Sequence, residues 1–272
     1  MANKLNKKIV FLGAGNMGFA IASGLVSSAL VNPLQIAFAD TVFAKATKAA
    51  KNLKARTFKT NQEATKWADI IFIAVKPGNI LELVKNLGKS IDKSKLVISV
   101  AAGISASFIE KNIGSKVPVI RSMPNTPALV GEGAIAISAG RYATKNHLLL
   151  ANKLFGAVGK VFIVPEKLMN AITAVSGSGP AYVFYLCELL EEVAQKLGLS
   201  LPLARELSAQ TFFGAGKMLL TSKSNVADLR LAVTSPNGTT EAAIKHLQKN
   251  IFGKVFKDSV MCACKRAQEL SR

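Results

Sequence analysis

The sequence predicts an α/β protein in which a doubly wound parallel sheet, residues 1–164, is followed by an all-helical region, residues 165–272. In the first part, short and almost continuously apolar runs alternate with helical segments, which is typical of βαβ units whose sheet is covered on both faces. After Pro165 the strand-like runs disappear and the chain becomes mainly helical. The length of 272 residues agrees with two domains at about 150 residues each.

The first expected strand, Ile9–Leu12, leads directly into a glycine turn, Gly13–Gly18, which reads Gly-Ala-Gly-Asn-Met-Gly before a helical segment. In this context the first glycine permits a tight turn, the second lets the backbone approach a pyrophosphate, and the third lets helix and strand pack closely. The helix N-terminus also offers free N–H groups and a positive dipole end to phosphates. The motif predicts a Rossmann-type dinucleotide-binding domain, and a glycine-rich turn without a ligand is the alternative.

The second expected strand, Ile36–Ala39, ends at Asp40, 22 residues after Gly18. An acidic residue at this distance commonly accepts hydrogen bonds from the adenosine ribose hydroxyls and disfavours a 2′-phosphate, which points to NAD. Lys45 and Lys48 follow closely and can neutralise a 2′-phosphate, which points to NADP. A carboxylate that caps the next helix is a third interpretation of Asp40. The choice between NADH and NADPH therefore stays open.

The later strands are expected at Asp69–Val75, Leu96–Val100, Val117–Arg121, Ala134–Ser138 and Val161–Val164. The third and the fifth strands in the chain lead into loops with chemical interest, Ala74–Gly78 and Arg121–Pro127. Ligands of open α/β sheets bind beyond the carboxyl ends of the strands, so both loops are expected to border the cofactor. A solvated loop lysine and a rigid connector are the alternative interpretations.

The helical region is unusually apolar. Helices are expected after Gly179-Pro180, over Leu203–Leu220, over Glu241–Leu247 and over about residues 254–270. Leu203–Leu220 is apolar nearly all round, which is typical of a buried helix. A helical segment of this length can hardly bury such helices by itself, so we expect a partner subunit.

The 233–240 loop, which precedes the helix at Glu241, reads Val-Thr-Ser-Pro-Asn-Gly-Thr-Thr. Its hydroxyl groups and successive backbone N–H groups stand at a helix N-terminus, which favours the binding of a carboxylate. Simple capping of the helix by Ser or Thr is the alternative interpretation.

Together these motifs resemble those of pyrroline-5-carboxylate reductase. The resemblance runs in order over nearly the whole chain, through the glycine turn, Ala74–Gly78, Ser122–Pro127, Val175–Tyr182 and Val233–Thr240. It implies the reduction of 1-pyrroline-5-carboxylate to L-proline with NADPH or NADH, the last step of proline biosynthesis. It also implies a Rossmann domain and a helical substrate domain that forms a homodimer, with a decamer as a further assembly.

The resemblance also implies roles for individual residues. The residues implied to bind the cofactor are Gly13, Gly15, Asn16, Met17, Gly18, Asn61, Ala74, Val75, Lys76, Pro77, Asn125 and Thr126. Asp40 is also expected to bind the cofactor, because of its position after the second strand. Those implied to bind the substrate carboxylate are Ser235, Gly238, Thr239 and Thr240. Thr240 would also reach the ring nitrogen, which makes it the expected catalytic residue.

Some positions depart from the family pattern. Asn237 stands where Gly is usual, Asn225 and Val226 replace a His-Pro pair, and Leu231 stands where Asp is usual. Asn tolerates a positive φ better than most residues, so we expect the 233–240 loop to form. The departures keep a second hypothesis open, a related NAD(P)H-dependent imine or keto-acid reductase on the same scaffold.

The absence of a strong general base from the motifs agrees with an imine substrate. Oxidation of a hydroxy acid needs a base for the hydroxyl proton, but the two histidines, His147 and His246, lie outside the motifs. A protonated imine already attracts hydride, so the protein has chiefly to position the reactants.

The net charge of +19 raises a third hypothesis, a nucleic-acid-binding or dinucleotide-sensing protein. Residues 1–164 carry 22 Lys and Arg against 7 Asp and Glu, so most of the charge lies on the domain expected to bind a polyanionic dinucleotide. We therefore expect no nucleic-acid partner.

The spacing of the three cysteines fits no metal site, and so few cysteines suit a reducing compartment. No apolar run reaches about 18 residues, and glycines interrupt the apolar stretch that begins at Ile9, unlike a signal peptide. We expect a cytoplasmic protein without membrane contact.

Overall fold

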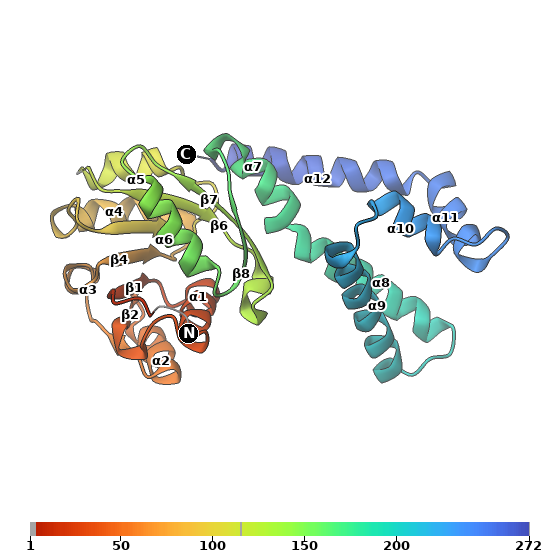
Figure 1. Ribbon diagram of the computed structural model, residues 1–272, viewed down its shortest axis with the longest axis horizontal. Helices are drawn as coiled ribbons and strands as arrows, with labels where there is room; N and C mark the ends of the chain where they lie inside the picture. Colours follow the sequence, from red (N-terminus) through yellow and green to blue (C-terminus); the bar gives the residue numbers. More distant parts are fainter. Residues whose placement is uncertain (1–3, 115, 272) are drawn as a thin grey trace. The chain divides into compact units, whose positions relative to one another are not determined.

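The computed structural model describes residues 4–114 and 116–271. The chain folds into two compact units. Unit 1 runs up to Gly177 and resumes at Ala263, whereas unit 2 comprises Ser178–Cys262. Figure 1 labels their helices and strands.

Unit 1 is built on one sheet. Its strands in the described residues are β1 (Ile9–Leu12), β2 (Ile36–Ala39), β3 (Arg56–Thr57), β4 (Ile70–Ile73), β5 (Leu96–Ser99), β6 (Val119–Met123), β7 (Gly133–Ala139) and β8 (Gly159–Ile163). Their order in the sheet is β3-β2-β1-β4-β5-β6-β7-β8. The seven predicted strands are confirmed, two with identical bounds and the others within two residues at each end. The short β3 was not expected.

The last two strands run against the others. Strands β1 to β6 pair in parallel, β7 pairs antiparallel with β6, and β8 pairs in parallel with β7. Only residues 124–132 separate β6 from β7, whereas a parallel connection needs a crossover of about a dozen residues or more. The short connection therefore accounts for the reversal, and the sheet is mostly parallel.

Helices cover both faces of this sheet (Figure 1). The helices of unit 1 are α1 (Asn16–Ser27), α2 (Phe43–Leu53), α3 (Asn61–Trp67), α4 (Ile80–Leu87), α5 (Ala106–Ile113), α6 (Lys145–Phe155) and α7 (Met169–Ile172). Single short turns of helix lie at Pro33–Gln35, Pro77–Asn79, Gly88–Ser90, Thr126–Val130 and Glu166–Leu168, and a wider turn at Thr173–Gly177.

Alternate side chains of each strand supply the two halves of the core, as the two-residue period of a strand requires. In β1, Ile9 and Phe11 pack with α1, α2 and α6, whereas Val10 and Leu12 pack with α3, α4 and α5. The Phe11 ring also stacks between those of the neighbouring strands β2 and β4, with centroids 5.5 and 4.7 Å away. A sheet buried on both faces explains why its strands are continuously apolar in the sequence.

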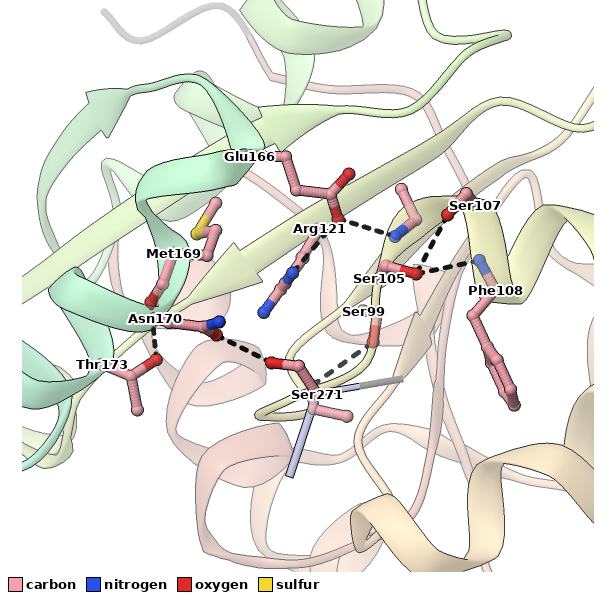
Figure 2. A network of polar contacts seen from close by, with 12 residues as sticks. Ser99, Ser105, Ser107, Phe108, Arg121, Glu166, Met169, Asn170, Thr173 and Ser271 are labelled. Carbon is pink, nitrogen blue, oxygen red and sulfur yellow. Dashed lines mark hydrogen bonds and ion pairs between the residues drawn. The ribbon is translucent and has the colours of Figure 1, made fainter. Parts of the chain in front are cut away.

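A partly buried ion pair joins β6 to the segment that follows the last strand. The side chain of Arg121 in β6 is only 8% exposed, and its Nη1 lies 3.2 Å from Oε1 of Glu166. The same carboxylate oxygen accepts the N–H of Ala106, the first residue of α5, at 2.8 Å. Figure 2 shows the Glu166 carboxylate directed toward Arg121. One carboxylate thus holds a strand, a helix start and the segment after β8 together.

The chain returns to unit 1 at its C-terminal end. The last helix, α12 (Phe252–Glu269), begins in unit 2, and the division falls inside it after Cys262. Ala267 is buried, and the Ser271 hydroxyl donates to Oδ1 of Asn170 at 2.9 Å (Figure 2). The Leu270 carbonyl oxygen lies so close to Gly103 that a Cβ there would be 2.7 Å from it.

Unit 2 contains the start of α12 and four further helices, α8 (Gly179–Lys196), α9 (Leu201–Thr221), α10 (Val226–Ala232) and α11 (Thr239–Lys249). The expected helices of this region are therefore confirmed. Within residues 178–262, all of which are described, only Ala204 and Ser208 are buried. Large exposed apolar side chains include Val183, Phe184, Tyr185, Leu190, Phe213 and Leu220. Such a surface is typical of an interface between subunits.

Candidate active site

The glycine turn connects β1 to α1, and two of its glycines are required by the local structure. Gly13 has φ +100°, and a Cβ on it would lie 2.6 Å from the carbonyl oxygen of Ala74. A Cβ on Gly18 would lie 2.9 Å from the carbonyl oxygen of Gly13. The first glycine therefore makes the turn and the third allows the close packing of helix against strand, as predicted.

Gly15 differs from both, because nothing in the described chain requires a glycine there. Its backbone is extended, with φ −79° and ψ 178°, which any residue can adopt. A Cβ on Gly15 would have no neighbouring atom within 4 Å. Gly15 is the N-cap of α1, no side chain caps this helix end, and its first turn contains no acidic residue. The result is an open, electropositive helix end into which a pyrophosphate fits.

Asp40, at the end of β2, is engaged with the glycine turn. Its Oδ2 accepts the N–H of Ala14 and its Oδ1 accepts the N–H of Val42, both at 2.8 Å. The N-cap of α2 is Val42, and no side chain caps that helix, so the capping interpretation of Asp40 is wrong. The carboxylate lies beside the phosphate-binding turn, where it brings negative charge to the side of the site expected for the adenosine ribose.

The loop after β4 lies against the same turn. The N–H of Ala74 donates to the carbonyl oxygen of Leu12 at 2.8 Å, which extends the pairing of β1 and β4 up to the glycine turn. Ala74 and Val75 are half-buried, whereas Lys76 and Pro77 are exposed. The backbone of this loop therefore borders the open helix end, and its lysine side chain is accessible to a ligand.

Asn61 begins α3 and is half-buried. Its carbonyl oxygen accepts the hydroxyl of Thr65. Its expected position beside the adenosine stays a prediction.

Asn125 has a bridging role within unit 1. Its Nδ2 donates to the carbonyl oxygen of Ser176 at 3.0 Å, and its Oδ1 accepts the N–H of Ala134 at 2.9 Å. The side chain is buried, and the neighbouring Thr126 is exposed. The carboxamide thus ties the loop after β6 to β7 and to Ser176. Of Asn125 and Thr126, only Thr126 has an accessible side chain.

In unit 2 the 233–240 loop leads into α11. The helix starts at Thr239, and its N-cap Gly238 has no side chain that can cap it. Thr240 is half-buried, and Ser235 and Thr239 are exposed. The loop therefore presents hydroxyl groups and an uncapped helix start together, which is a suitable arrangement for a carboxylate. Asn237 has φ +58°, so it takes the left-handed conformation expected of a residue that replaces glycine.

The other departures have local roles. Asn225 caps α10, because its Oδ1 accepts the N–H of Asp228 at 3.0 Å. Leu231 is exposed.

His147 lies outside the candidate site. It caps α6 reciprocally with Thr144, and partial burial lowers its pKa. The described residues contain no group of three metal-ligating side chains. None of the helices in the described ranges is long and apolar enough to cross a membrane.

Comparisons with known proteins cover nearly the whole chain. A family model for pyrroline-5-carboxylate reductase dimerisation matches residues 166–270, and one for coenzyme F420-dependent NADP oxidoreductase matches residues 8–103. The chain is 38% identical over 265 residues to the pyrroline-5-carboxylate reductase of Pseudomonas aeruginosa, and the match covers 97% of each protein. It is 38% identical over 269 residues to that of Methanosarcina acetivorans, covering 98% of this chain and 99% of the relative.

Solved structures show the same likeness. The pyrroline-5-carboxylate reductase of Coxiella burnetii matches with a TM-score of 0.90 and 37% identity, over 98% of this chain and all of the other. The pyrroline carboxylate reductase of Plasmodium falciparum, with NADP bound, matches with a TM-score of 0.91 and 30% identity, over 99% of this chain and all of the other.

Proposed function

The chain belongs to the pyrroline-5-carboxylate reductase family, and from this premise we infer how its residues divide the reaction between them. The protein reduces 1-pyrroline-5-carboxylate to L-proline with NAD(P)H, the final step of proline biosynthesis. When bound, the dinucleotide supplies a hydride to the imine carbon of the ring. The observation that carries this function is the open N-terminus of α1 at Gly15. It is found in a chain that is similar to these reductases over 97% of its length.

We propose that the cofactor is held by residues of unit 1. The N–H groups of Gly15, Asn16, Met17 and Gly18 bind the pyrophosphate, with Gly13 shaping the turn. Asp40 and Asn61 contact the adenosine half. The backbone of Ala74 and Val75, with Lys76 and Pro77, lines the site after β4, and Thr126 lies on the nicotinamide side. Asn125 supports that side by fixing the loop through its bonds to Ser176 and Ala134.

We propose that the 233–240 loop binds the substrate carboxylate. The hydroxyls of Ser235 and Thr239 and the N–H groups at the start of α11 supply donors, and the absence of a side chain on Gly238 lets the anion approach. Thr240 reaches the ring nitrogen with its hydroxyl and keeps the proton there, since a protonated imine needs no strong base. The protein then acts mainly by holding the imine carbon of the substrate and the nicotinamide of the cofactor in a reactive orientation.

The protein forms a homodimer through its helical region. We propose that residues 165–272 constitute the substrate and dimerisation domain, that 1–164 constitute the dinucleotide domain, and that dimers assemble further to a decamer. We also propose a cytoplasmic location, because a chain with three free cysteines suits a reducing compartment.

The experiment that tests this function measures NADPH and NADH oxidation with 1-pyrroline-5-carboxylate and with a panel of linear keto acids. Thr240→Ala should lower kcat by about 100-fold, within the range of a lost transition-state hydrogen bond, and leave the Kd for cofactor unchanged. Thr211→Ala, which removes a hydroxyl bonded within α9, is the matched control. No turnover of the cyclic imine by folded protein would refute the proposal, and preference for a keto acid would favour the related reductase.

A further inference from the structure

The 233–240 loop contains a residue in an unfavourable backbone region directly beside its expected ligand-binding atoms. Asn237 has φ +58°, and it immediately precedes Gly238, the N-cap of α11. The left-handed region is accessible to Asn but favoured by Gly, so an interaction that holds the Asn237 backbone stabilises the loop more than it would with glycine there.

Glu241 supplies that interaction. It is the third residue of α11, and its Oε2 accepts the N–H of Asn237 at 3.0 Å. The carboxylate therefore reaches back past Thr240, Thr239 and Gly238 and bonds the residue before them. A glutamate in the third position of a helix commonly bonds the N-cap N–H. Here Glu241 bonds the N–H of Asn237, the residue before the N-cap. The bond therefore connects the two ends of the segment Gly238–Thr240, which is proposed to contact the substrate.

A second contact adjusts the charge of this carboxylate. The Nζ of Lys245 lies 3.1 Å from the same Oε2, one turn further along α11. The hydrogen bond from Lys245 and then that from the Asn237 N–H lower the pKa of Glu241, so the group is ionised at neutral pH. The lysine also offsets a negative charge that would otherwise stand next to an anion site.

We propose that Glu241 is a positioning residue for substrate binding, which holds Gly238, Thr239 and Thr240 in the geometry that receives the carboxylate. The inference rests on the proposed function for the identity of the ligand. It rests on the Asn237 contact alone for the bracing of the loop.

The test compares Glu241→Ala and Glu241→Gln with the parent dimer. Alanine removes the acceptor, and we expect KM for 1-pyrroline-5-carboxylate to rise about tenfold, the loss expected for one hydrogen bond to a charged group. The Kd for NADPH should stay within about twofold. Glutamine retains an Oε1 that can accept the Asn237 N–H, so it should restore most of the lost affinity. Gln248→Ala, an exposed change on the same helix, controls for weakening of α11 itself.

Hydrogen exchange of the 233–240 loop provides a readout that is independent of activity. The amide of Asn237 should exchange faster in Glu241→Ala than in the parent and the Gln248→Ala control. Unchanged KM together with unchanged exchange would overturn the inference, and so would a glutamine variant as impaired as the alanine one. If the parent itself fails to reduce the cyclic imine, the proposed function falls, while the exchange rates still decide whether Glu241 braces the loop.

Discussion

Gly15→Ala separates cofactor binding from folding. The added methyl group meets no atom within 4 Å in the protein, and the backbone at φ −79° accepts any residue. The exchange of one N-cap residue without a side-chain cap for another should cost less than about 1 kcal/mol of unfolding free energy. For a chain of this size, that corresponds to a fall in Tm of no more than about 4 °C.

The same methyl group projects into the space proposed for the pyrophosphate. A phosphate displaced from the helix end loses about two hydrogen bonds to backbone N–H groups, each worth about 1.5 kcal/mol when one partner is charged. The sum, about 3 kcal/mol, corresponds to a Kd for NADPH that rises about 100-fold. Isothermal titration with NADPH and thermal unfolding of the same samples measure both quantities.

Gly13→Ala is the matched comparison. Its Cβ would lie 2.6 Å from the Ala74 carbonyl oxygen at a position with φ +100°, so this variant should lose stability as well as affinity. The reasoning fails if Gly15→Ala binds NADPH as tightly as the parent. It also fails if Gly15→Ala is as unstable as Gly13→Ala, because the glycine would then be a requirement of the fold.

Three further outcomes are expected. Glu166→Ala leaves Arg121 and the Ala106 N–H without their common acceptor, so it should lower the unfolding free energy by about 3 kcal/mol. Urea unfolding at one fixed protein concentration measures this loss, and a loss below about 0.5 kcal/mol would contradict the role of Glu166. Asp40→Ser removes a negative charge beside the glycine turn and should raise the ratio of kcat/KM for NADPH over NADH by about tenfold, so an unchanged ratio would place Asp40 away from the ribose. Burial raises the pKa of Glu110 above the ordinary value of a glutamate, so the contribution of the protonated group to stability is present at acidic pH and is lost as pH rises through the raised pKa. Glu110→Gln should remove that decline, which for one proton cannot exceed about 1.4 kcal/mol per pH unit, and unfolding midpoints that fall equally in both proteins would refute the assignment.

The sheet was predictable because its physics is local. Buried parallel strands need apolar side chains on both faces, and runs such as Ile9–Leu12 and Ile36–Ala39 have that composition in the sequence. Arg56–Thr57 has no such apolar run. This two-residue edge strand is held by backbone pairing with β2 and by Nε of Arg56, which donates to the Leu34 carbonyl oxygen at 3.1 Å, so hydropathy gives no signal for β3. The reversal at β7 could have been inferred from the shortness of the connection.

The candidate site was predictable in its motifs and less so in its contacts. The distinct environments of Gly13 and Gly15 follow from the strand–turn–helix context, which the sequence contains. The bridging role of Asn125 depends on Ser176, far along the chain, and no periodic pattern encodes that distance. Glu241 lies four residues after its partner Asn237, and its position near a helix start was the available signal.

The path of the chain has a consequence for cleavage and truncation. Unit 2 is an insertion, because the polypeptide leaves unit 1 after Gly177 and re-enters it at Ala263. A single protease cut between those points therefore leaves each fragment attached to unit 1, one through the peptide bond at Gly177 and the other through the docked end at Ser271. Removal of the last few residues, in contrast, would abolish the docking of the C-terminal segment on unit 1. Unit 2 would then be connected to unit 1 only through the peptide bond after Gly177.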